Sequence, residues 1–322
     1  ALKLCRLHGV RQNPGKLGMI AFGGAFHGKT MGAQTMTGKE AAWKWIGNLD
    51  PCIYHLPCPT DAFREMEQIY DEEAGRRQFA RDIKSLEDSG VDLDTIAGAI
   101  FEPYQGWAAL FYPIGYIKAL REFLDEKNAL LVSDEVQAGF GRTGKLFGYE
   151  YYGIDVDIIC CGKAVSGALP LSAVLSRAEI LDVDGSLNST HGGSPLPCAS
   201  ALANLKYIEE HHLVEEAKRK EKIILEKFNE MKALFPDRIR AIHGMGMAYA
   251  AVVVKPGTKE LDVELVDRVI ERAFEKGVMS IRTMTGTIKV GPPLTIADDA
   301  LGEAMDVLKE SMTAIVRAQT SL

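Results

Sequence analysis

The sequence predicts an α/β fold, in which a mostly parallel central sheet is flanked by helices and followed by a smaller α+β unit. Short apolar runs alternate with longer stretches of helical periodicity along most of the chain. Several of these runs are apolar on both faces, which is typical of strands buried in a parallel sheet. Near Phe235-Pro236-Asp237 a helical stretch is interrupted and a different pattern begins. The alternation favours the α/β class, and the change of pattern favours a second unit.

The elements of the first unit follow from these patterns in order. The chain opens on ALKLCRLHGV, which has the pattern of an amphipathic helix but no capping residue ahead of it. Helices are predicted at Thr60–Glu73, Gln78–Asp88 and Tyr116–Lys127, with Pro113 just before the last. The apolar runs are the predicted strands, and they are LGMIAF, TIAGAIF, ALLVSDEV, DIICC and LSAVLS.

The second unit has its own order. Helices at about Leu196–Glu210 and Leu213–Leu234 precede the interruption, and the run IHGMGMAYAAVVV follows it. Later helices are predicted near Asp262–Lys276 and Asp298–Val316, around the short runs GVMSIR and GTIKVG. We therefore predict a large domain of residues 1–235 and a small C-terminal α+β domain of residues 236–322.

The composition indicates a globular protein that acts on small molecules. Its 322 residues are 47% hydrophobic, which is enough for a sizeable core. The formal charge is −7 with no basic block, so neither nucleic acid nor an acidic membrane surface is expected as a partner. Glycines and a proline interrupt the most apolar segment, which leaves no run of ~20 residues for a membrane span. The six cysteines include no CxxC pair, which predicts a reduced cytoplasmic setting and no metal site.

Lys163 is the only charged residue between Ile158 and Leu175. A segment as apolar as this one is expected to be buried. Burying an ammonium group is costly unless the group is paired, loses its proton or forms a covalent bond. The sequence therefore predicts a special role or a special partner for Lys163.

Acidic residues end a neighbouring predicted strand. Asp134 and Glu135 close ALLVSDEV, and Lys163 follows the next strand, DIICC. Because carboxyl ends of parallel strands meet at one edge of a sheet, an acid and an amine are expected at the same edge. One interpretation is a salt bridge or a lysine that reaches solvent. The other is an amine that forms a Schiff base with an aldehyde cofactor, pyridoxal phosphate, whose ring nitrogen the acid keeps protonated.

The local sequence resembles one family. LVSDEVQAGFGRTGKLFGYEYYGIDVDIICCGKAVSGALPLSAV is similar to the core signature of class III aminotransferases, which are fold-type-I enzymes that depend on pyridoxal 5'-phosphate. The resemblance covers nearly the whole chain and continues, in the family's order, in AFHGKTMGA, FEPYQG, STHGGSPLPCASALA, IHGMGM and KVGPPLTI.

The resemblance implies roles for individual residues. Lys163 would form the Schiff base with the cofactor and then act as the base that moves a proton to and from the substrate carbon. Asp134 would pair with the ring nitrogen. Gln137 would contact the ring hydroxyl. The ring faces would pack against Val136 on one side and against the aromatic pair Phe26-His27 on the other, with Phe26 at the stacking position.

Thr190, in NSTHGGSP, matches the threonine that reaches from a neighbouring subunit to the cofactor phosphate. The resemblance therefore implies a homodimer. Without it, a threonine before two glycines indicates only a turn. In the family, a segment with a phosphate-binding turn precedes the position where this chain begins. Either this chain is a fragment of a longer protein, or it is a truncated product.

The chain departs from the family where substrates bind. Lys29 stands where many members have an arginine after the FHG motif, which keeps the charge but loses the bidentate fork. Trp107 and Lys289 stand where many members have a glutamate and an arginine that together form a switch for α-carboxylates. Glu102, of FEPYQG, is grouped with these residues as a candidate substrate contact. We expect no arginine clamp for glutamate and 2-oxoglutarate here.

Trp107 offers a flat apolar surface with one donor, which suits an amino sugar or a cyclic amine. A structural tryptophan buried under a loop is the alternative.

We expect an aminotransferase that moves an amino group from a primary amine donor to a keto or aldehyde acceptor by a ping-pong mechanism. The alternatives are an epimerase or aminomutase on the same scaffold, and a non-catalytic protein of the same fold.

Overall fold

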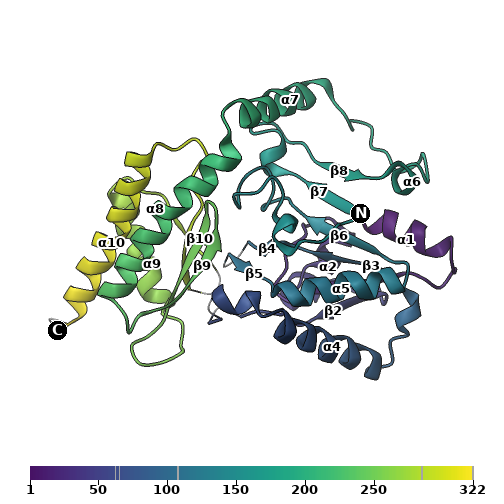
Figure 1. The fold of residues 1–322 in the computed structure, drawn as a ribbon, viewed down its shortest axis with the longest axis horizontal. Helices are drawn as coiled ribbons and strands as arrows, with labels where there is room; N and C mark the ends of the chain where they lie inside the picture. The colour runs from purple at the N-terminus through teal and green to yellow at the C-terminus, as the bar shows by residue number, and fades with distance from the viewer. Residues whose placement is uncertain (62, 65, 107–108, 284–285, 321–322) are drawn as a thin grey trace.

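The computed structural model describes residues 1–61, 63–64, 66–106, 109–283 and 286–320. Figure 1 shows two units side by side, with the N-terminal unit on the right and the C-terminal unit on the left. Helix α7 (Pro195–Glu210) runs along the top, and α8 (Leu213–Leu234) continues from it into the C-terminal unit. No described helix is both long enough and apolar enough to cross a membrane.

In the described part of the chain, the first unit is built on a six-stranded sheet in the order β2-β1-β3-β6-β7-β8. Neighbouring strands are parallel except β7 and β8, which are antiparallel. The mostly parallel sheet and its predicted strands are confirmed. The strands are β1 (Gly18–Phe22), β2 (Ile53–Leu56), β3 (Ile96–Phe101), β6 (Leu130–Asp134), β7 (Ile158–Cys161) and β8 (Ala173–Ser176).

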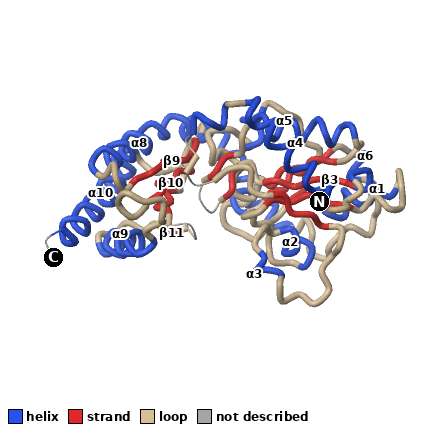
Figure 2. The backbone as a smooth tube through the Cα atoms, turned by 90° about the horizontal axis from the view of Figure 1, so that it is seen from below, coloured by secondary structure: helices blue, strands red, loops and turns tan. Residues whose placement is uncertain are grey.

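Helices cover both faces of this sheet (Figure 2). Helices α4 (Glu72–Asp88) and α5 (Ile114–Glu126) pack on one face, where Ile20 and Phe22 of β1 are buried. The alternate residues of β1, Met19 and Ala21, are buried on the other face. That second face is covered by α1 (Leu2–Val10), α2 (Met31–Met36) and α6 (Ala178–Leu181). Both faces are therefore apolar, which explains the continuous apolar runs in the sequence.

The predicted helix Thr60–Glu73 is wrong. The described residues 60, 61, 63 and 64 are not helical, the short 3-10 helix η1 (Met66–Tyr70) follows, and α4 begins only at Glu72. The physical reason is the cap of α4: the side chain of Asp71 accepts a hydrogen bond from the amide of Ala74 at 2.9 Å, which starts a new helix. Helix α4 contains the predicted Gln78–Asp88, and α5 matches the predicted Tyr116–Lys127 within a few residues.

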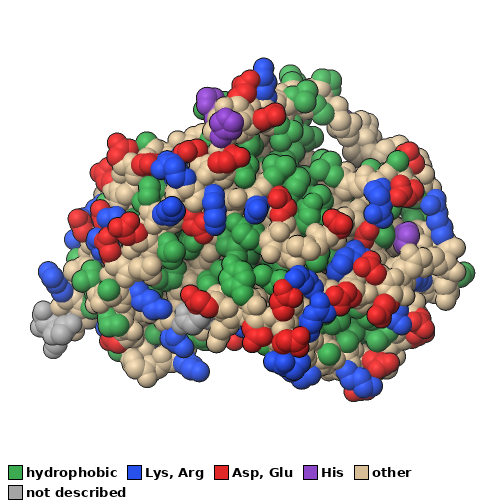
Figure 3. Space-filling view, in the orientation of Figure 1, with side chains coloured by type: hydrophobic (Ala, Val, Ile, Leu, Met, Phe, Trp, Pro, Cys, Tyr) green, Lys and Arg blue, Asp and Glu red, His purple; other side chains and the backbone are tan. Residues whose placement is uncertain are grey.

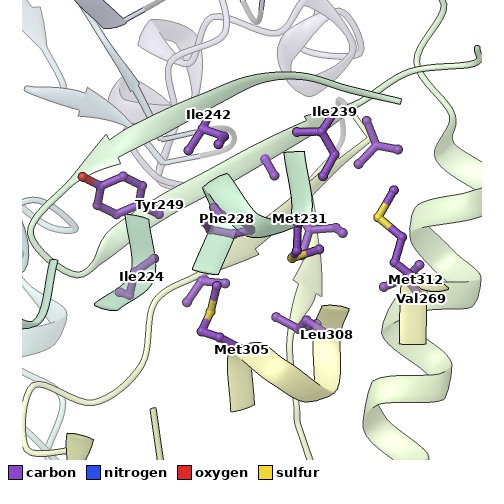
Figure 4. Close-up of a cluster of buried hydrophobic side chains, with 14 of the residues drawn as sticks. Ile224, Phe228, Met231, Ile239, Ile242, Tyr249, Val269, Met305, Leu308 and Met312 are labelled. Carbon is purple, nitrogen blue, oxygen red and sulfur yellow. The ribbon is translucent and has the colours of Figure 1, made fainter. Parts of the chain in front are cut away.

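The C-terminal unit contains an antiparallel sheet in the order β11-β12-β10-β9. Buried side chains of α8, α9 and α10 pack against one face of it and form one core, part of which Figure 4 shows. The opposite face carries Ala248 and Ala250, which pack against Tyr104 and Phe111 of the first unit. The elements are β9 (Ile239–Met245), β10 (Ala248–Val253), α9 (Val263–Glu275), β11 (Ile281–Arg282), β12 (Thr287–Val290) and α10 (Asp298–Thr320).

The predicted division at residues 235 and 236 stays a prediction, and one observation bears on it: α8 packs in the core of the C-terminal unit. The predicted helices of this half of the chain lie within a few residues of α7, α8, α9 and α10. The remaining short elements are α3 (Glu40–Trp43), η2 (Leu93–Thr95), β4 (Tyr104–Gln105), β5 (Leu110–Phe111), η3 (Gly148–Tyr152) and η4 (Lys163–Val165).

Candidate active site

Asp134 and Lys163 lie at the same edge of the first sheet. Strands β6 and β7 are parallel neighbours, and Asp134, the last residue of β6, is in register with Cys160 of β7. Lys163 follows the end of β7 after a single glycine. The carboxyl ends of parallel strands are the usual ligand-binding edge of such a sheet. The structure therefore places an acid and an amine at this edge, as the sequence led us to expect.

The carboxylate of Asp134 is buried and held in a fixed orientation. Its Oδ2 is 2.8 Å from Nδ1 of His27, and its Oδ1 accepts a hydrogen bond from the amide of Val136 at 3.1 Å. The side chains of His27 and Asp134 are only 1% and 7% exposed. Since the Asp134 oxygens accept, Nδ1 of His27 must carry the proton. The ring of His27 therefore contacts the acid, a contact that the sequence did not predict.

Glu102 is a second buried carboxyl near this pair. One of its oxygens accepts a hydrogen bond from the amide of Phe26 at 3.3 Å. Burial raises the pKa of Glu102 to about 7, although the nearby His27 opposes the shift. The aromatic ring of Phe26 is 48% exposed. Phe26 is therefore accessible from the solvent, whereas Glu102 is buried.

Glu135, which the sequence groups with Asp134, points elsewhere. Its carboxylate accepts hydrogen bonds from the amides of Gly148 and Tyr149 and from the hydroxyl of Ser133, at 2.8, 3.0 and 2.9 Å. Burial raises its pKa to about 7. Since successive side chains of a strand alternate in direction, only Asp134 faces the site. Glu135 instead holds the loop that follows.

Lys163 has an unusual backbone and an open side chain. Its φ angle is +43°, in the left-handed region that residues with a Cβ rarely adopt. Residues held in such conformations cluster at functional sites. The Lys163 side chain is exposed, and none of the hydrogen bonds among the described residues uses its amine.

The predicted burial of the whole segment from Ile158 to Leu175 is wrong. Cys161 and Val165 are buried, but Leu169, Val174 and Leu175 are 41%, 37% and 45% exposed. Strand β8 is the last strand of its sheet, so no described strand pairs with its outer edge. Lys163 is exposed as well, so its lone charge does not lie in an apolar core.

A cavity of about 1090 Å³ begins at Lys163 and extends toward the C-terminal unit. Val136, Gln137 and Lys163 line it from the first unit, and Lys289 and Leu294 from the second. Figure 3, which has the orientation of Figure 1, shows apolar side chains gathered in the middle of the molecule, between the two units. A cavity of this size holds a cofactor together with a small substrate.

Gln137 and Lys289 meet across the two units. The side-chain oxygen of Gln137 accepts hydrogen bonds from the hydroxyl of Tyr104 at 3.1 Å and from the amine of Lys289 at 2.9 Å. The amine of Lys289 also donates to the carbonyl of Gly106. The sequence singled out Lys289 only as a substrate contact and did not single out Tyr104. The one available signal for Tyr104 was its place in the FEPYQG motif.

Arg142, in the loop GFGRTG, also joins the two units. Its guanidinium donates to the carbonyls of Met247 and Pro292, at 3.1 and 2.6 Å. The backbones approach so closely that a Cβ on Gly246 would lie 2.3 Å from the carbonyl carbon of Thr143. The loop therefore fixes the C-terminal unit against the wall of the cavity.

Two of the remaining predicted residues, Lys29 and Thr190, do not line the cavity. Lys29 is exposed just before α2, and Thr190 lies in an exposed turn between α6 and α7. Val136 contacts the backbone beside Lys163, since a Cβ on Gly162 would lie 3.2 Å from a Val136 methyl group. Trp107 lies outside the described residues.

Comparisons with known proteins assign the family. The family model described as "Aminotransferase class-III" matches residues 1–312. The chain belongs to the class III aminotransferases. It is 34% identical over 311 residues to a 4-aminobutyrate aminotransferase of Mycobacterium bovis, a match that covers 93% of this chain and 68% of the relative. A 2-aminoadipate transaminase of Pseudomonas putida is 33% identical over 325 residues, covering 95% of this chain and 73% of the relative.

Solved structures agree with this family. An amine transaminase from an uncultivated Pseudomonas species, described as being in the PLP-bound form, superposes with a TM-score of 0.86 at 28% identity. The match covers 97% of this chain and 73% of that one. The fold is that of the fold-type-I transaminases, as the sequence predicted, and class III aminotransferases use pyridoxal 5'-phosphate.

The residues of this class III aminotransferase fit that cofactor. Asp134 offers a buried, oriented carboxylate for a ring cation, and Lys163 offers an unbonded amine at the same edge. The other ring nitrogen of His27, Nε2, is buried and has no hydrogen-bond partner in the described chain. Such a group is expected near a polar ligand or water. No cluster of the described His, Cys, Asp and Glu side chains could hold a metal ion.

Proposed function

We propose that this class III aminotransferase transfers an amino group from a primary amine donor to a carbonyl acceptor in two half-reactions at one site. The observation that supports this best is the unbonded amine of Lys163, held by a strained backbone at the sheet edge that also carries Asp134. Bound pyridoxal phosphate would supply an aldehyde that combines with amines and a ring that accepts electrons.

The residues of the chain would then divide the work. Lys163 would hold the cofactor at rest and move a proton to and from the substrate carbon. Asp134, oriented by His27, would favour a proton on the ring nitrogen, because a carboxylate stabilises a nearby cation. Gln137 would donate from its amide to the ring oxygen, and Val136 and Phe26 would cover the two faces of the ring.

The half-reaction test separates this proposal from an isomerase. Given a donor amine and no acceptor, the protein should release about one carbonyl product per site and then stop. An epimerase or aminomutase would release none and would exchange the hydrogen on the reacting carbon with deuterium from the solvent. That second result would replace the proposal. A chain that binds pyridoxal phosphate but does neither would favour the non-catalytic alternative.

We further propose that the donor is not glutamate held by an arginine clamp, because Lys29 and Lys289 replace the arginines and Lys289 is already bonded to protein acceptors. Amino sugars, cyclic amines, 4-aminobutyrate and 2-aminoadipate are the donors to screen, the last two because relatives bear those names. Glutamate as the best donor would contradict this.

Replacing Trp107 by Glu together with Lys289→Arg restores the glutamate and arginine that many family members have. This double variant should use glutamate better than the wild type, and unchanged use would count against the proposed switch for α-carboxylates.

We also propose a homodimer in which Thr190 contacts the cofactor of the partner subunit. Exposed apolar side chains on β8 and α7 support this: Leu175, Leu196 and Leu202 are 45%, 75% and 70% exposed. Leu202→Asp should convert dimer to monomer in analytical ultracentrifugation, and an unchanged dimer would contradict the choice of this face. The predicted cytoplasmic location stays a prediction.

A further inference from the structure

The amine of Lys289 is already hydrogen-bonded to protein groups and is not free to bind a substrate carboxylate. Lys289 lies on β12 of the C-terminal unit, and its amine reaches into the first unit. There it donates to the side-chain oxygen of Gln137 at 2.9 Å and to the carbonyl of Gly106. It also lies 5.7 Å from the centroid of the Tyr104 ring. Both of its described hydrogen-bond partners are protein acceptors.

These contacts fix which way the Gln137 amide faces. A protonated lysine can only donate, so the atom of Gln137 that meets Lys289 must be the oxygen. Tyr104 donates to the same oxygen at 3.1 Å, and burial raises the pKa of Tyr104, which keeps its hydroxyl protonated. The oxygen has accepted two donors and is saturated. The amide NH2 is left for the cavity that Gln137 lines.

Gly106 completes this arrangement. A Cβ on Gly106 would lie 2.1 Å from the oxygen of Gln137, so only glycine lets the amide occupy this position. The Gly106 carbonyl and the Gln137 oxygen both accept from the one amine of Lys289. The three groups come from three separate segments of the chain, and Lys289 is the cation that connects them.

We propose that Lys289 is a positioning residue for the cofactor: it holds the oxygen of Gln137 so that the amide NH2 faces the ring oxygen of bound pyridoxal phosphate. This inference rests on the proposed function, which gives Gln137 that contact. Without Lys289 the amide could rotate and present its oxygen instead, and two acceptors would then face each other. Lys289 acts through Gln137 and does not touch the reacting atoms.

The charge of Lys289 distinguishes the positioning role from direct binding of a substrate carboxylate, because only the second depends on that charge. Its pKa is lowered to about 8, mainly by burial; Glu102 opposes the shift, and Lys163 and Arg142 add to it. The neutral amine still has two N–H groups, one for each acceptor, so both hydrogen bonds remain after deprotonation. A clamp for a substrate carboxylate would instead weaken as the pH rises through that value.

The test titrates the full chain, freed of cofactor, with pyridoxal phosphate. Lys289→Met should weaken cofactor binding about tenfold, which is the factor that one hydrogen bond typically contributes, and should move the visible absorption band. Lys255→Met is the matched control, because Lys255 is an exposed lysine of the same unit paired with Glu260. It should leave both readouts unchanged.

A double-mutant cycle decides whether Lys289 acts through Gln137. In a Gln137→Leu background, Lys289→Met should change cofactor affinity by less than about twofold. Gly106→Ala is the second variant: it should displace the Gln137 amide and weaken cofactor binding while Lys289 stays in place. Circular dichroism checks that each variant is folded.

Two results would overturn the proposal, and they are distinct from failure of the proposed function. One is a Lys289→Met protein with unchanged cofactor affinity and band position, whose defect is confined to the KM of a carboxylate substrate. The other is an equal effect of Lys289→Met with and without Gln137. If the wild-type chain binds no pyridoxal phosphate at all, the cofactor role itself fails, and the proposal fails with it.

Discussion

The two sides of the active-site edge are built in opposite ways. On the acid side, Asp134 at the end of β6 and Gln137 just after it have hydrogen-bond partners, and the His27 side chain that contacts Asp134 is almost fully buried. On the lysine side, after β7, Lys163 is exposed, strained in its backbone and without a hydrogen bond in the described chain. Groups that present a fixed charge or dipole are pre-organised, whereas the group that must make and break a covalent bond is left free.

The largest expected effect comes from the lysine side. Lys163→Ala should lower kcat by about 10³-fold or more, because it removes both the group that holds the cofactor and the proton-transfer base. Its stability should not fall, since Lys163 makes no hydrogen bond in the described chain. Steady-state kinetics and urea unfolding of the cofactor-free protein check both statements. Turnover at the parent rate would remove Lys163 from the mechanism.

The acid side should respond in stability as well as in rate. Asp134→Ala should lower kcat/KM by about 10²-fold, and it should destabilise the cofactor-free protein by about 2 kcal/mol because buried His27 loses its acceptor. Asp134→Asn keeps an oxygen for His27, so it should lose activity with less loss of stability. Urea unfolding compares these variants with Lys163→Ala. Equal stability of Asp134→Ala and Lys163→Ala would break the contrast between the two sides.

A smaller effect is expected from Glu102 and depends on pH. Burial raises its pKa from 4.5 to about 7, so the folded protein binds the proton more tightly than the unfolded chain does. The stability that this group contributes is present below pH 4.5 and is lost as the pH rises through 7. Glu102→Gln keeps an oxygen for the Phe26 amide and removes the titration. It should be more stable than wild type at pH 8 by on the order of 1–3 kcal/mol, and by much less at pH 5.

Melting temperatures of the cofactor-free proteins at both pH values measure this effect. Glu135 has a pKa raised in the same direction, so the variant should lose only part of the wild-type pH dependence. A Glu102→Gln protein whose melting temperature tracks that of the wild type at every pH would show that Glu102 does not titrate in this range.

The sequence predicted the main sheet well because its strands are buried on both faces, which leaves continuous apolar runs. It missed β2, whose residues Ile53–Leu56 are mostly half-buried and include a histidine and a tyrosine. It also missed β4 and β5, which have two residues each. Strands this short leave no periodicity to detect.

The site was predictable in its location but not in its contacts. Asp134 and Lys163 could be placed at one edge because strand ends meet there. The partners of the acid side could not be predicted, because His27 lies 107 residues from Asp134, and Lys289 lies 152 residues from Gln137. Such pairs depend on how separate elements pack together, which no local pattern contains. The sequence did not predict the exposure of Leu169 and Leu175, because an apolar segment does not reveal whether another part of the protein covers it.

The central claim is that Lys163 is the amine that binds the cofactor. The most direct measurement incubates the protein with pyridoxal phosphate, reduces it with borohydride and maps the modified peptide by mass spectrometry. We predict a visible absorption band that disappears on reduction and a phosphopyridoxyl group on Lys163, with no such adduct at this position in Lys163→Ala. A stable adduct on another lysine, or a folded protein that forms none, would contradict the account.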